Sequence, residues 1–326
     1  MNLKFAIDKT AEEWAEDEHI VDCGSYSELR SGFWYTDLKL PLSANIHTCR
    51  ANHGIYASFK YRALFENQDW KNSLGLSLPE LSNGILHTGS ASHYHYLIDG
   101  IGNLSAAALR AAKNLFVDAD YSDDQLTFLS RVIYAQIGRQ LNLVRITRGT
   151  YRVADVIIMK TKNLPRRVRK VRTLVGQLRV EQQKPKQRIY VTRRRAKTRH
   201  LFNEAQFIDK ICSKYKFIVV ENEDLSLQEQ LELYSNAEFV IGPHGAGLTN
   251  VVFSKRPRGL LEFWHSVKRP FYDHLCEVLE ISYLDANGIP LPSTSTGWRK
   301  DDNSFIVDEN MALRAVELLV ARTPAG

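Results

Sequence analysis

The alternation of strand and helix patterns along the second half of the chain is the feature that most restricts its fold. Short apolar, β-prone runs recur there, at 189–192, 217–220, 239–241, 260–263 and 281–284. The stretches between them carry helix start signals or amphipathic spacing. Regular alternation of this kind predicts a parallel sheet with helices on both faces. A similar series runs from Gly84 to Met159, so we predict an α/β protein with two such sheets.

Helix starts are marked by a Ser or Asn that is followed three residues later by Gln or Glu. Such pairs can cap a helix reciprocally, and they occur at Ser122 and Gln125, Asn203 and Gln206, and Ser226 and Glu229. Longer patterns predict a helix over 93–112, a basic helix over 164–181 and an amphipathic helix over 311–320. Before residue 80, strand patterns occur at 33–35 and 54–59.

With 326 residues, the chain is long enough for two domains, each with its own core. We place an N-terminal α/β domain at 1–163, a second domain at 164–300 and a C-terminal helical segment at 301–326. The apolar content of 44% and charged content of 25% are those of a soluble globular protein. Without a long apolar run or a signal-peptide pattern, we expect a cytoplasmic protein. The four cysteines are scattered, which predicts neither disulfides nor a zinc site.

A glycine-rich segment, Gly242 to Asn250, follows the strand at 239–241 and has the sequence Gly-Pro-His-Gly-Ala-Gly-Leu-Thr-Asn. Glycines allow a sharp turn and a close approach of the backbone to a ligand. Amides at the start of a following helix carry a partial positive charge, so the expected guest is a phosphate or pyrophosphate. An imidazole in such a turn, here His244, can donate to an oxyanion. The segment matches neither common nucleotide-binding fingerprint, and a tight turn without a ligand is the alternative.

Arginines follow the strand at 189–192, in the sequence Arg193-Arg194-Arg195-Ala196-Lys197-Thr198-Arg199. Ligands of open α/β sheets bind at the carboxyl ends of the strands, so this cluster and the glycine segment are expected at one edge. A guanidinium group can donate two parallel hydrogen bonds to phosphate oxygens, and its positive charge neutralises a departing diphosphate. Arg193 and Arg199 are the first candidates for phosphate contact. Glu262 closes another strand at this edge and can accept hydrogen bonds from a ribose, or else pair with a nearby Lys or Arg.

In the first half of the chain, His95 and Asp99 are four residues apart, which places them on one face of a helix. A carboxylate beside an imidazole fixes its tautomer and makes it a better base. A helix-start histidine with a solvated partner is the alternative. One domain that holds a diphosphate and another that holds a His–Asp pair together predict a group transfer in the cleft between them.

Together these motifs resemble glycosyltransferase family 61, which contains bacterial capsular-polysaccharide transferases and eukaryotic xylosyl- and N-acetylglucosaminyltransferases. The resemblance covers about Leu86 to Tyr283, with the motifs in the family's order. They are Tyr94-His95-Tyr96-Leu97-Ile98-Asp99; Thr192-Arg193-Arg194 with Arg199-His200-Leu201-Phe202-Asn203-Glu204; and Gly242 to Asn250 with Phe253 and Glu262.

The chain departs from the family pattern just before the first motif. The family usually has Asn-Tyr there, and this chain has Ser92 and His93. This leaves open whether His93 adds a second imidazole or changes the choice of acceptor. Residues 1–80 match no pattern that we can name. A catalytically inactive member of the family is an alternative, but His95 and Asp99 are both present.

The resemblance implies a GT-B-like architecture: two Rossmann-like domains with parallel sheets that face a central cleft, the nucleotide lying mainly on the C-terminal one. It implies an inverting transfer from a nucleotide sugar, most simply a UDP-sugar, to a glycan or lipid-linked glycan in capsular or other surface polysaccharide biosynthesis. His95 or Asp99 would be the catalytic base, and no metal or other cofactor would be required. The implied nucleotide-binding residues are Arg193, Arg199, Asn203, Glu204, Gly242, His244, Gly245, Ala246, Gly247, Leu248, Asn250 and Glu262.

Two other functions are compatible with parts of the sequence. Asp118 and Asp120 follow an apolar strand, as the D-x-D motif of a metal-dependent GT-A transferase does, although an ordinary polar turn has the same pattern.

Between Lys160 and Arg199 there are 16 Lys or Arg and one acid, a block that could bind nucleic acid or an anionic membrane. Tyr190 is the single aromatic residue from position 164 to 199, so base stacking and nucleic-acid binding are not expected. Peripheral contact with the inner face of the plasma membrane is one interpretation of the block, and a solvated helix face over Arg166 to Arg179 is the alternative.

Overall fold

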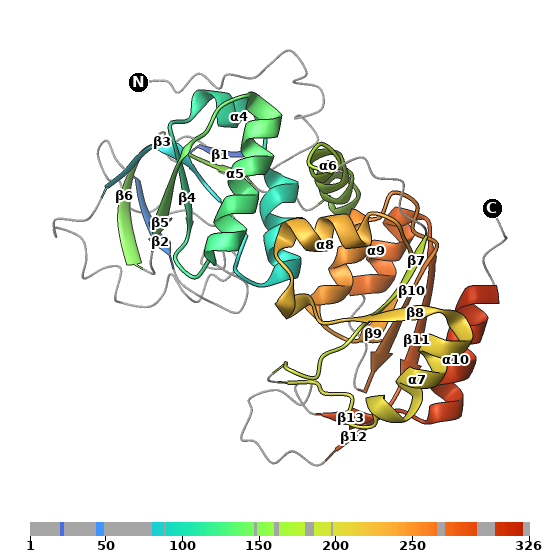
Figure 1. The fold of residues 1–326 in the computed structure, drawn as a ribbon. Coiled ribbons are helices and arrows are strands. Elements are labelled where there is room, and N and C mark those ends of the chain that lie inside the picture. Colours follow the sequence, from blue (N-terminus) through green and yellow to red (C-terminus); the bar gives the residue numbers. More distant parts are fainter. Residues whose placement is uncertain are drawn as a thin grey trace. The chain divides into compact units, whose positions relative to one another are not determined.

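The computed structural model describes residues 20–22, 44–48, 80–87, 89–146, 149–159, 163–179, 186–196, 198–265, 271–291 and 304–321. The chain divides into two compact units, Met1–Leu178 and Arg179–Gly326, and each contains a sheet with helices against it (Figure 1). The expected domain limits at residues 163 and 300 stay predictions. The strands expected at 33–35 and 54–59, and the expected end of the basic helix at residue 181, lie outside the described residues. Among the described helices, none combines the length and the apolar character that a membrane span needs.

The first unit contains a six-stranded sheet of mixed direction. Its strands are β1 (Ile20–Asp22), β2 (Ala44–Thr48), β3 (Glu80–Leu86), β4 (Asn114–Asp118), β5 (Asn142–Ile146) and β6 (Gly149–Met159). They are ordered β1-β6-β3-β4-β5, and β2 also pairs with β6. Strands β6, β3, β4 and β5 run parallel, whereas β1 and β2 lie antiparallel to β6. The parallel strands predicted in this half are therefore present.

Helical segments follow these strands. They are η2 (His95–Gly100), η3 (Ile101–Asn103), α4 (Ala106–Ala111), α5 (Asp123–Ile137) and α6 (Leu164–Gly176). The capping box of Ser122 and Gln125 is present at the start of α5, as predicted. The basic helix is present as α6, and it lies within the first unit.

The long helix predicted over 93–112 is wrong. The segment forms the π-helical turn η2 and the 3-10 turn η3, and α4 starts only after two extended residues. Two close contacts explain the break. A Cβ on Gly100 would lie 2.5 Å from Cε1 of His87, and a Cβ on Gly102 would lie 2.9 Å from Cβ of Arg167. Packing against the end of β3 and against α6 therefore overrides the helix preference of the alanines.

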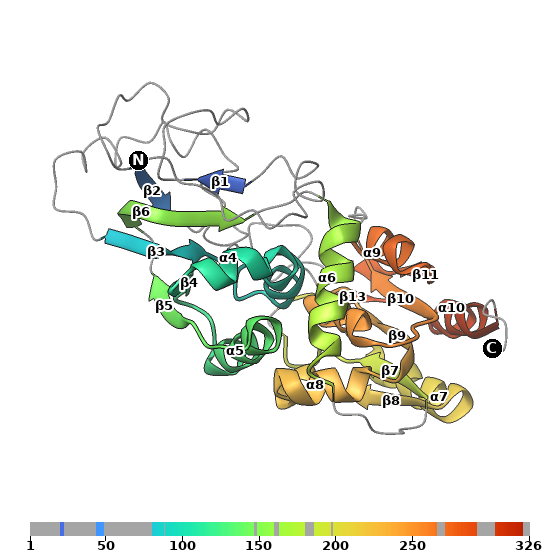
Figure 2. The ribbon, with the colours of Figure 1, turned by 90° about the horizontal axis from the view of Figure 1, so that it is seen from above.

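The second unit is built on a five-stranded, fully parallel sheet (Figure 2). Its strands are β7 (Gln187–Val191), β8 (Phe217–Val220), β9 (Ala237–Pro243), β10 (Gly259–Trp264) and β11 (Ser282–Asn287). The order is β11-β10-β9-β7-β8, so the chain moves outward from β7 to β8 and then returns to the other side of β7. This is a doubly wound arrangement in which the strand order reverses between β7 and β9. The parallel sheet predicted for this half is confirmed.

Helices cover both faces of the second sheet. They are α7 (Glu204–Tyr215), α8 (Leu227–Tyr234), α9 (Phe271–Leu279) and α10 (Glu309–Ala321), with the 3-10 turns η4 (Asn222–Asp224) and η5 (Ala246–Phe253) and the small strands β12 (Ile289–Pro290) and β13 (Phe305–Ile306). Helices α7 and α10 lie on one face, and α8 and α9 lie on the other (Figures 1 and 2). The capping box predicted at Ser226 and Glu229 starts α8.

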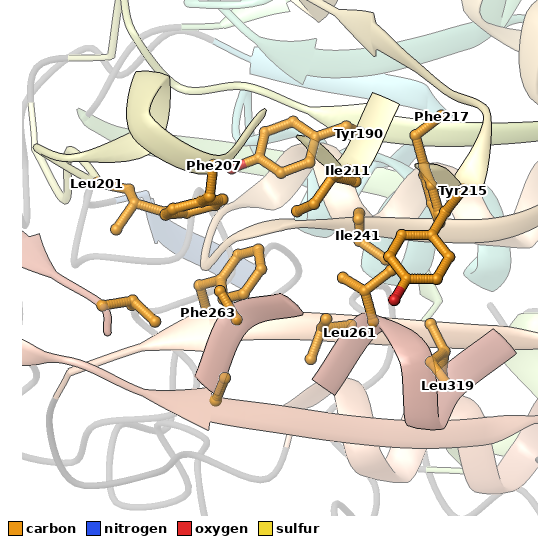
Figure 3. Close-up of a cluster of buried hydrophobic side chains, with 14 of the residues drawn as sticks. Tyr190, Leu201, Phe207, Ile211, Tyr215, Phe217, Ile241, Leu261, Phe263 and Leu319 are labelled. Atoms are coloured by element: carbon orange, nitrogen blue, oxygen red, sulfur yellow. The ribbon is translucent and has the colours of Figure 1, made fainter. Parts of the chain in front are cut away.

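A buried apolar cluster joins α7 and α10 to the sheet (Figure 3). Phe207 and Ile211 of α7 pack there with Leu261 and Phe263 of β10, and Leu319 brings in α10. Burying one such side chain contributes about 2 kcal/mol to stability. Helix α10 therefore shares a core with the strands, and the packing fixes the sheet whose strand ends carry the candidate site.

Candidate functional site

The carboxyl ends of β7 and β9 are neighbours at the point where the strand order of the second sheet reverses. Such a switch point leaves a crevice beyond the strand ends, and ligands of open α/β sheets bind there. The arginine segment, residues 193–199, follows β7, and the glycine segment, residues 242–250, closes β9 and continues beyond it. The topology therefore brings together the two segments that the sequence predicts to bind phosphate.

Arg193 and Gly245 are in contact at this edge. The guanidinium of Arg193 fills the space beside Gly245, so a Cβ there would overlap Nη1 and would lie 2.8 Å from Cζ. Arg193 also donates from Nη2 to the carbonyl of Thr198 at 3.1 Å. Arg199 has a positive φ of 59°, and its charge acts on His244. Both predicted phosphate-binding arginines are thus close to the glycine turn.

The neighbouring arginines are directed toward acidic side chains. Nη2 of Arg194 lies 3.4 Å from Oε1 of Glu221. Nε of Arg195 lies 2.7 Å from Oε2 of Glu221, and its Nη1 pairs with Asp224. Both arginines are exposed. These acids partly neutralise Arg194 and Arg195, and phosphate binding by Arg193 and Arg199 stays a prediction.

At two further glycines of the turn, neighbouring protein atoms leave no room for a side chain. A Cβ on Gly242 would run into the carbonyl oxygen of Val191, and a Cβ on Gly247 would lie 2.6 Å from Nδ2 of Asn222. The helix expected after the turn is the 3-10 helix η5, with Leu248 donating from its N–H to the carbonyl of Gly245 at 3.1 Å. Close packing at the strand ends, rather than unusual backbone angles, therefore requires these glycines.

His244 is buried at the turn, and contacts of its imidazole ring fix the orientation of the side chain. Its Nδ1 is hydrogen bonded to Oε1 of Glu262, and the ring meets Trp264 edge-on with centroids 3.7 Å apart. Burial lowers the pKa of His244, Glu262 acts to raise it, and Arg199 and Arg193 lower it further. Because Nδ1 faces a carboxylate, the neutral ring carries its proton there, and Nε2 is the remaining nitrogen for a ligand.

Glu262 is almost fully buried, and both of its oxygens have partners. Oε1 pairs with His244, and Oε2 accepts a hydrogen bond from the hydroxyl of Tyr283 at 2.6 Å. The carboxylate therefore orients His244, while the predicted contact with a ribose stays a prediction. Tyr272 supports the same turn by donating from its hydroxyl to the carbonyl of Gly245 at 2.6 Å. Sequence reasoning missed both tyrosines, because neither belongs to a motif.

Asn250 lies in a buried hydrogen-bond network behind the turn. Its Nδ2 donates to Oε1 of Gln230 at 2.8 Å, and Nε2 of Gln230 donates to the carbonyl of Asn222 at 3.0 Å. The hydroxyl of Tyr234 donates to Oδ1 of Asn222 at 2.8 Å. In the described part of the chain, Nδ2 of Asn222 is buried beside Gly247 without a hydrogen-bond partner. Asn222 is a candidate that the sequence did not reveal, and nucleotide binding by Asn250 stays a prediction.

Asn203 and Glu204 anchor the arginine segment. The Asn203 side chain donates to the carbonyl of Val307 at 2.7 Å and accepts from the N–H of Val307 at 3.1 Å. It makes no cap to α7, so that prediction is wrong: its backbone, at φ −97° and ψ 21°, lacks the extended conformation of an N-cap. Glu204 accepts from the hydroxyl of Thr192 at 2.6 Å, and burial raises the pKa of Glu204. A nucleotide-binding role for either residue stays a prediction.

In the first unit, His95 and Asp99 contact each other, as their spacing predicts. Nδ1 of His95 lies 2.5 Å from Oδ2 of Asp99, and the carbonyl of Asp99 accepts from Nδ2 of Asn103 at 2.6 Å. Arg167 of α6 forms an ion pair with Oδ1 of Asp99. Burial and the charge of Asp99 raise the pKa of Tyr94 to about 12, against the effect of Arg167. Sequence reasoning missed Arg167, because its basic run has the pattern of a solvated helix face.

Asp118 and Asp120 are the candidates for a D-x-D motif; Asp118 ends β4, and Asp120 lies in the turn that follows. Oδ1 of Asp118 accepts from the backbone N–H of Asp120 at 3.0 Å, and Asp118 is buried. Within the described ranges, no group of three or more His, Cys, Asp or Glu side chains is arranged to hold a metal ion. The observed contact is that of a polar turn.

A doubly wound parallel sheet with arginines and a glycine turn at its switch point is typical of nucleotide-binding enzymes. The sequence profile of the family described as Glycosyltransferase 61 matches residues 90–261 of the 326. The chain therefore belongs to glycosyltransferase family 61, and the protein is a glycosyltransferase. The matched region holds His95, Asp99 and both segments that the sequence predicts to bind phosphate, and it ends one residue before Glu262.

The chain is also similar to a curated animal enzyme. The EGF domain-specific O-linked N-acetylglucosamine transferase of Drosophila melanogaster is 28% identical to it over 114 residues. This region is 34% of the present chain and 22% of the Drosophila protein. The chain thus matches about a fifth of the length of that relative.

Proposed function

We propose that this glycosyltransferase is an inverting enzyme that transfers a sugar from a UDP-sugar to a glycan or lipid-linked glycan of a surface polysaccharide, such as a capsule. The observation that carries the proposal is the contact between Arg193 and Gly245 at the switch point of the second sheet. Arg199 adds a cationic group at the same edge, and His244 can donate from Nε2 there once its ring is protonated. A diphosphate is the ligand whose charge and shape suit such a set.

The departing nucleoside diphosphate carries the negative charge that develops during sugar transfer. A guanidinium group can donate two parallel hydrogen bonds to phosphate oxygens. Donors that are already in position need no reorganisation while the negative charge develops. In this proposal Arg193, Arg199 and the amides of Gly245 to Leu248 supply the compensating charge, so that no metal ion or other cofactor is required.

The reaction is a single displacement. The acceptor hydroxyl oxygen attacks the anomeric carbon on the face opposite the diphosphate, and the configuration at that carbon inverts. The bond from the anomeric carbon to the phosphate oxygen breaks, and its electron pair leaves with UDP. The acceptor proton passes to the pair of His95 and Asp99. A positioned base of this kind contributes about 10²–10⁴-fold to the rate.

We extend the proposal to a GT-B architecture, with a Rossmann-like lobe in each unit and the nucleotide on the second. Its support is the doubly wound order of the second sheet and the parallel strands β6, β3, β4 and β5 of the first.

The proposed location is the cytoplasm, at the inner face of the plasma membrane. The basic residues of α6, with Arg169 exposed, suit contact with anionic lipids. Arg188 and Arg195 of the basic block pair with acids, which disfavours a nucleic-acid surface.

The Drosophila relative suggests which donor to test first. Its name specifies an N-acetylglucosamine transferase, so UDP-N-acetylglucosamine is the first nucleotide sugar to compare with others. The match covers a fraction of that protein, and the acceptor of the present chain is proposed from its family resemblance alone.

A thermal-shift screen of nucleoside diphosphates and nucleotide sugars tests the proposed function. UDP and a UDP-sugar should give the largest rise in Tm, because a ligand at 100 times its Kd stabilises the folded state by about 2.7 kcal/mol. Arg193→Ala should abolish this rise. Arg194→Ala, which removes an exposed arginine that pairs with Glu221, should preserve it. Equal shifts for all nucleotides, or an unchanged shift in Arg193→Ala, would refute the proposed site.

A further inference from the structure

We infer that Tyr283 is a positioning residue that acts through Glu262 on the His244 ring at the proposed diphosphate site of the second unit. The inference rests on the proposed function, because it concerns a group that would contact the leaving diphosphate. It adds a residue of β11 that no motif contains. It also gives Glu262 a role that differs from the ribose contact predicted from the sequence.

The register of the second sheet places Tyr283 and Glu262 on the same face. Tyr283 of β11 is the direct partner of Leu260 of β10, two residues before Glu262. Residues two apart in a strand share a face, so the two side chains lie on one side of the sheet. Leu261 and Phe263, the strand neighbours of Glu262, belong to the apolar cluster with α7 and α10 on the other side. The hydroxyl of Tyr283 therefore reaches the carboxylate diagonally across two adjacent strands.

The carboxylate of Glu262 connects residues that follow or belong to the strands on either side of β10. Its Oε1 is hydrogen bonded to Nδ1 of His244, just beyond β9, and its Oε2 accepts from the hydroxyl of Tyr283 at 2.6 Å. The side chains of Glu262 and His244 are only 4% and 11% exposed, so these protein contacts replace most of the contact with water. With Oε2 held by Tyr283, the carboxylate cannot rotate freely, and Oε1 stays directed at His244.

Other charged and titratable groups surround these contacts. In the described part of the chain they are Arg193 and Arg199 of the arginine segment, Tyr272, Asp273 and Cys276 of α9, and Asp285 of β11. The two arginines lower the pKa of His244. Burial raises the pKa of Cys276, so its thiol is neutral. Burial and the charge of Glu262 raise the pKa of Tyr283, so its phenol keeps its proton and donates. Glu262 is thus the acid in contact with His244, and Tyr283 donates a hydrogen bond to that acid.

The hydroxyl of Tyr283 reduces the attraction of Glu262 for a second proton on the His244 ring. A hydrogen bond to a carboxylate stabilises the anion most when no adjacent cation balances its charge, so this bond favours a neutral ring. Without the hydroxyl, His244 should become protonated at a higher pH. Without the carboxylate it should become protonated at a lower pH, because Glu262 acts to raise its pKa. The two changes have opposite signs, which a general loss of structure would not produce.

Nitrogen-15 NMR of the His244 ring over a pH series tests this inference on the full chain without any ligand. The signals of the ring are identified by their absence in His244→Gln. Tyr283→Phe should raise the midpoint of the titration by about 1 pH unit, and Glu262→Gln should lower it. Tyr215→Phe is the matched control, because Tyr215 is another buried tyrosine of the second unit and its hydroxyl interacts with Lys214. This variant should match the wild type.

Three outcomes of the titration would overturn the inference. They are an unchanged midpoint in Tyr283→Phe, an unchanged midpoint in Glu262→Gln, and shifts of the same sign in both variants. A shift in Tyr215→Phe as large as that in Tyr283→Phe would also overturn it, because the effect would then not come from the hydrogen bond to Glu262.

Calorimetry with UDP-N-acetylglucosamine separates failure of the inference from failure of the proposed function. If His244 contacts the diphosphate, the rise in affinity toward low pH should move upward by about 1 pH unit in Tyr283→Phe. The affinity at a pH on that rise should then increase by up to about tenfold. A shifted ring titration without a shifted affinity profile would overturn the proposed contact of His244 with the diphosphate. Absence of binding by UDP and UDP-sugars would overturn the proposed function, while the ring titration would still decide the role of Tyr283.

Discussion

The guanidinium of Arg193 occupies the space that a side chain at residue 245 would need. Gly245→Ala should therefore displace Arg193 and weaken UDP binding by about tenfold, or about 1.4 kcal/mol. The backbone at Gly245 is extended, with φ 178°, so alanine adds no backbone strain there and the effect reports the steric conflict. Isothermal titration calorimetry measures the affinity. Arg194→Ala, which removes an exposed arginine that pairs with Glu221, serves as the control. Equal UDP affinities in Gly245→Ala and the wild type would show that Arg193 does not contribute to phosphate binding.

The affinity for a UDP-sugar should rise as the pH falls. Burial, together with Arg199 and Arg193, lowers the pKa of His244 in the free protein, and a bound diphosphate should raise it again. Binding then takes up a proton, and the affinity increases as pH falls through the higher pKa of the complex toward the lower one of the free protein. A nucleotide sugar is the suitable probe, because its diphosphate does not titrate near neutral pH.

His244→Gln should flatten this dependence. Glu262→Gln removes the group that acts to raise the pKa of His244, so it should move the rise in affinity to lower pH. Calorimetry in two buffers with different ionisation enthalpies counts the protons that are taken up. A wild-type affinity that is independent of pH, with no proton uptake, would exclude His244 from the phosphate contact.

Asn203→Ala should destabilise the second unit by about 1–3 kcal/mol, because the backbone N–H and carbonyl of Val307 both lose their partner. Urea unfolding followed by circular dichroism measures the loss. Gln206→Ala, an exposed residue in the first turn of α7, is the matched control and should change stability little. UDP affinity in the same variants shows whether Asn203 also contacts the nucleotide, as the motif predicts. A stable Asn203→Ala protein would mean that the pairing with Val307 contributes little.

The first unit should lose stability below pH 6.5 because of His87. The ring is fully buried, with Nδ1 2.8 Å from the hydroxyl of Tyr121, and burial lowers its pKa from 6.5 to about 3. Below pH 6.5 the unfolded chain binds a proton that the folded chain excludes, so the free energy of unfolding falls by at most about 1.4 kcal/mol per pH unit down to pH 3. Urea unfolding between pH 7 and pH 4 measures the slope. His87→Gln should reduce it, and the exposed His274→Gln should not. If His87→Gln keeps the wild-type slope, other groups cause the acid sensitivity.

Local structure was predictable from the sequence, whereas contacts between distant segments were not. The capping boxes at Ser122 and Ser226 formed as predicted, because both partners of each box lie within four residues. The helix predicted over 93–112 is interrupted because His87 and Arg167 press against two of its glycines. Neither neighbour can be inferred from the composition of the segment itself.

The motifs located the segments of the candidate site but not the contacts of their side chains. Topology alone brings residues 193–199 and 242–250 to one edge, since parallel strands end on the same side of a sheet. The ion pair of Arg167 with Asp99 joins residues that are far apart in the chain, and no spacing rule encodes it. No spacing rule predicts the hydrogen bond of Tyr283 either, whose hydroxyl donates to the carboxylate of Glu262 on the neighbouring strand.

Residues made late in synthesis hold the arginine segment in place. The N–H of Phe202 donates to the carbonyl of Phe305 at 2.8 Å, and the N–H of Phe305 donates to the carbonyl of His200 at 2.9 Å. The ribosome adds this anchoring stretch after all five strands of the second sheet have been synthesised. The segment that follows the arginines therefore reaches its final position only when the stretch around Phe305 has docked beside it.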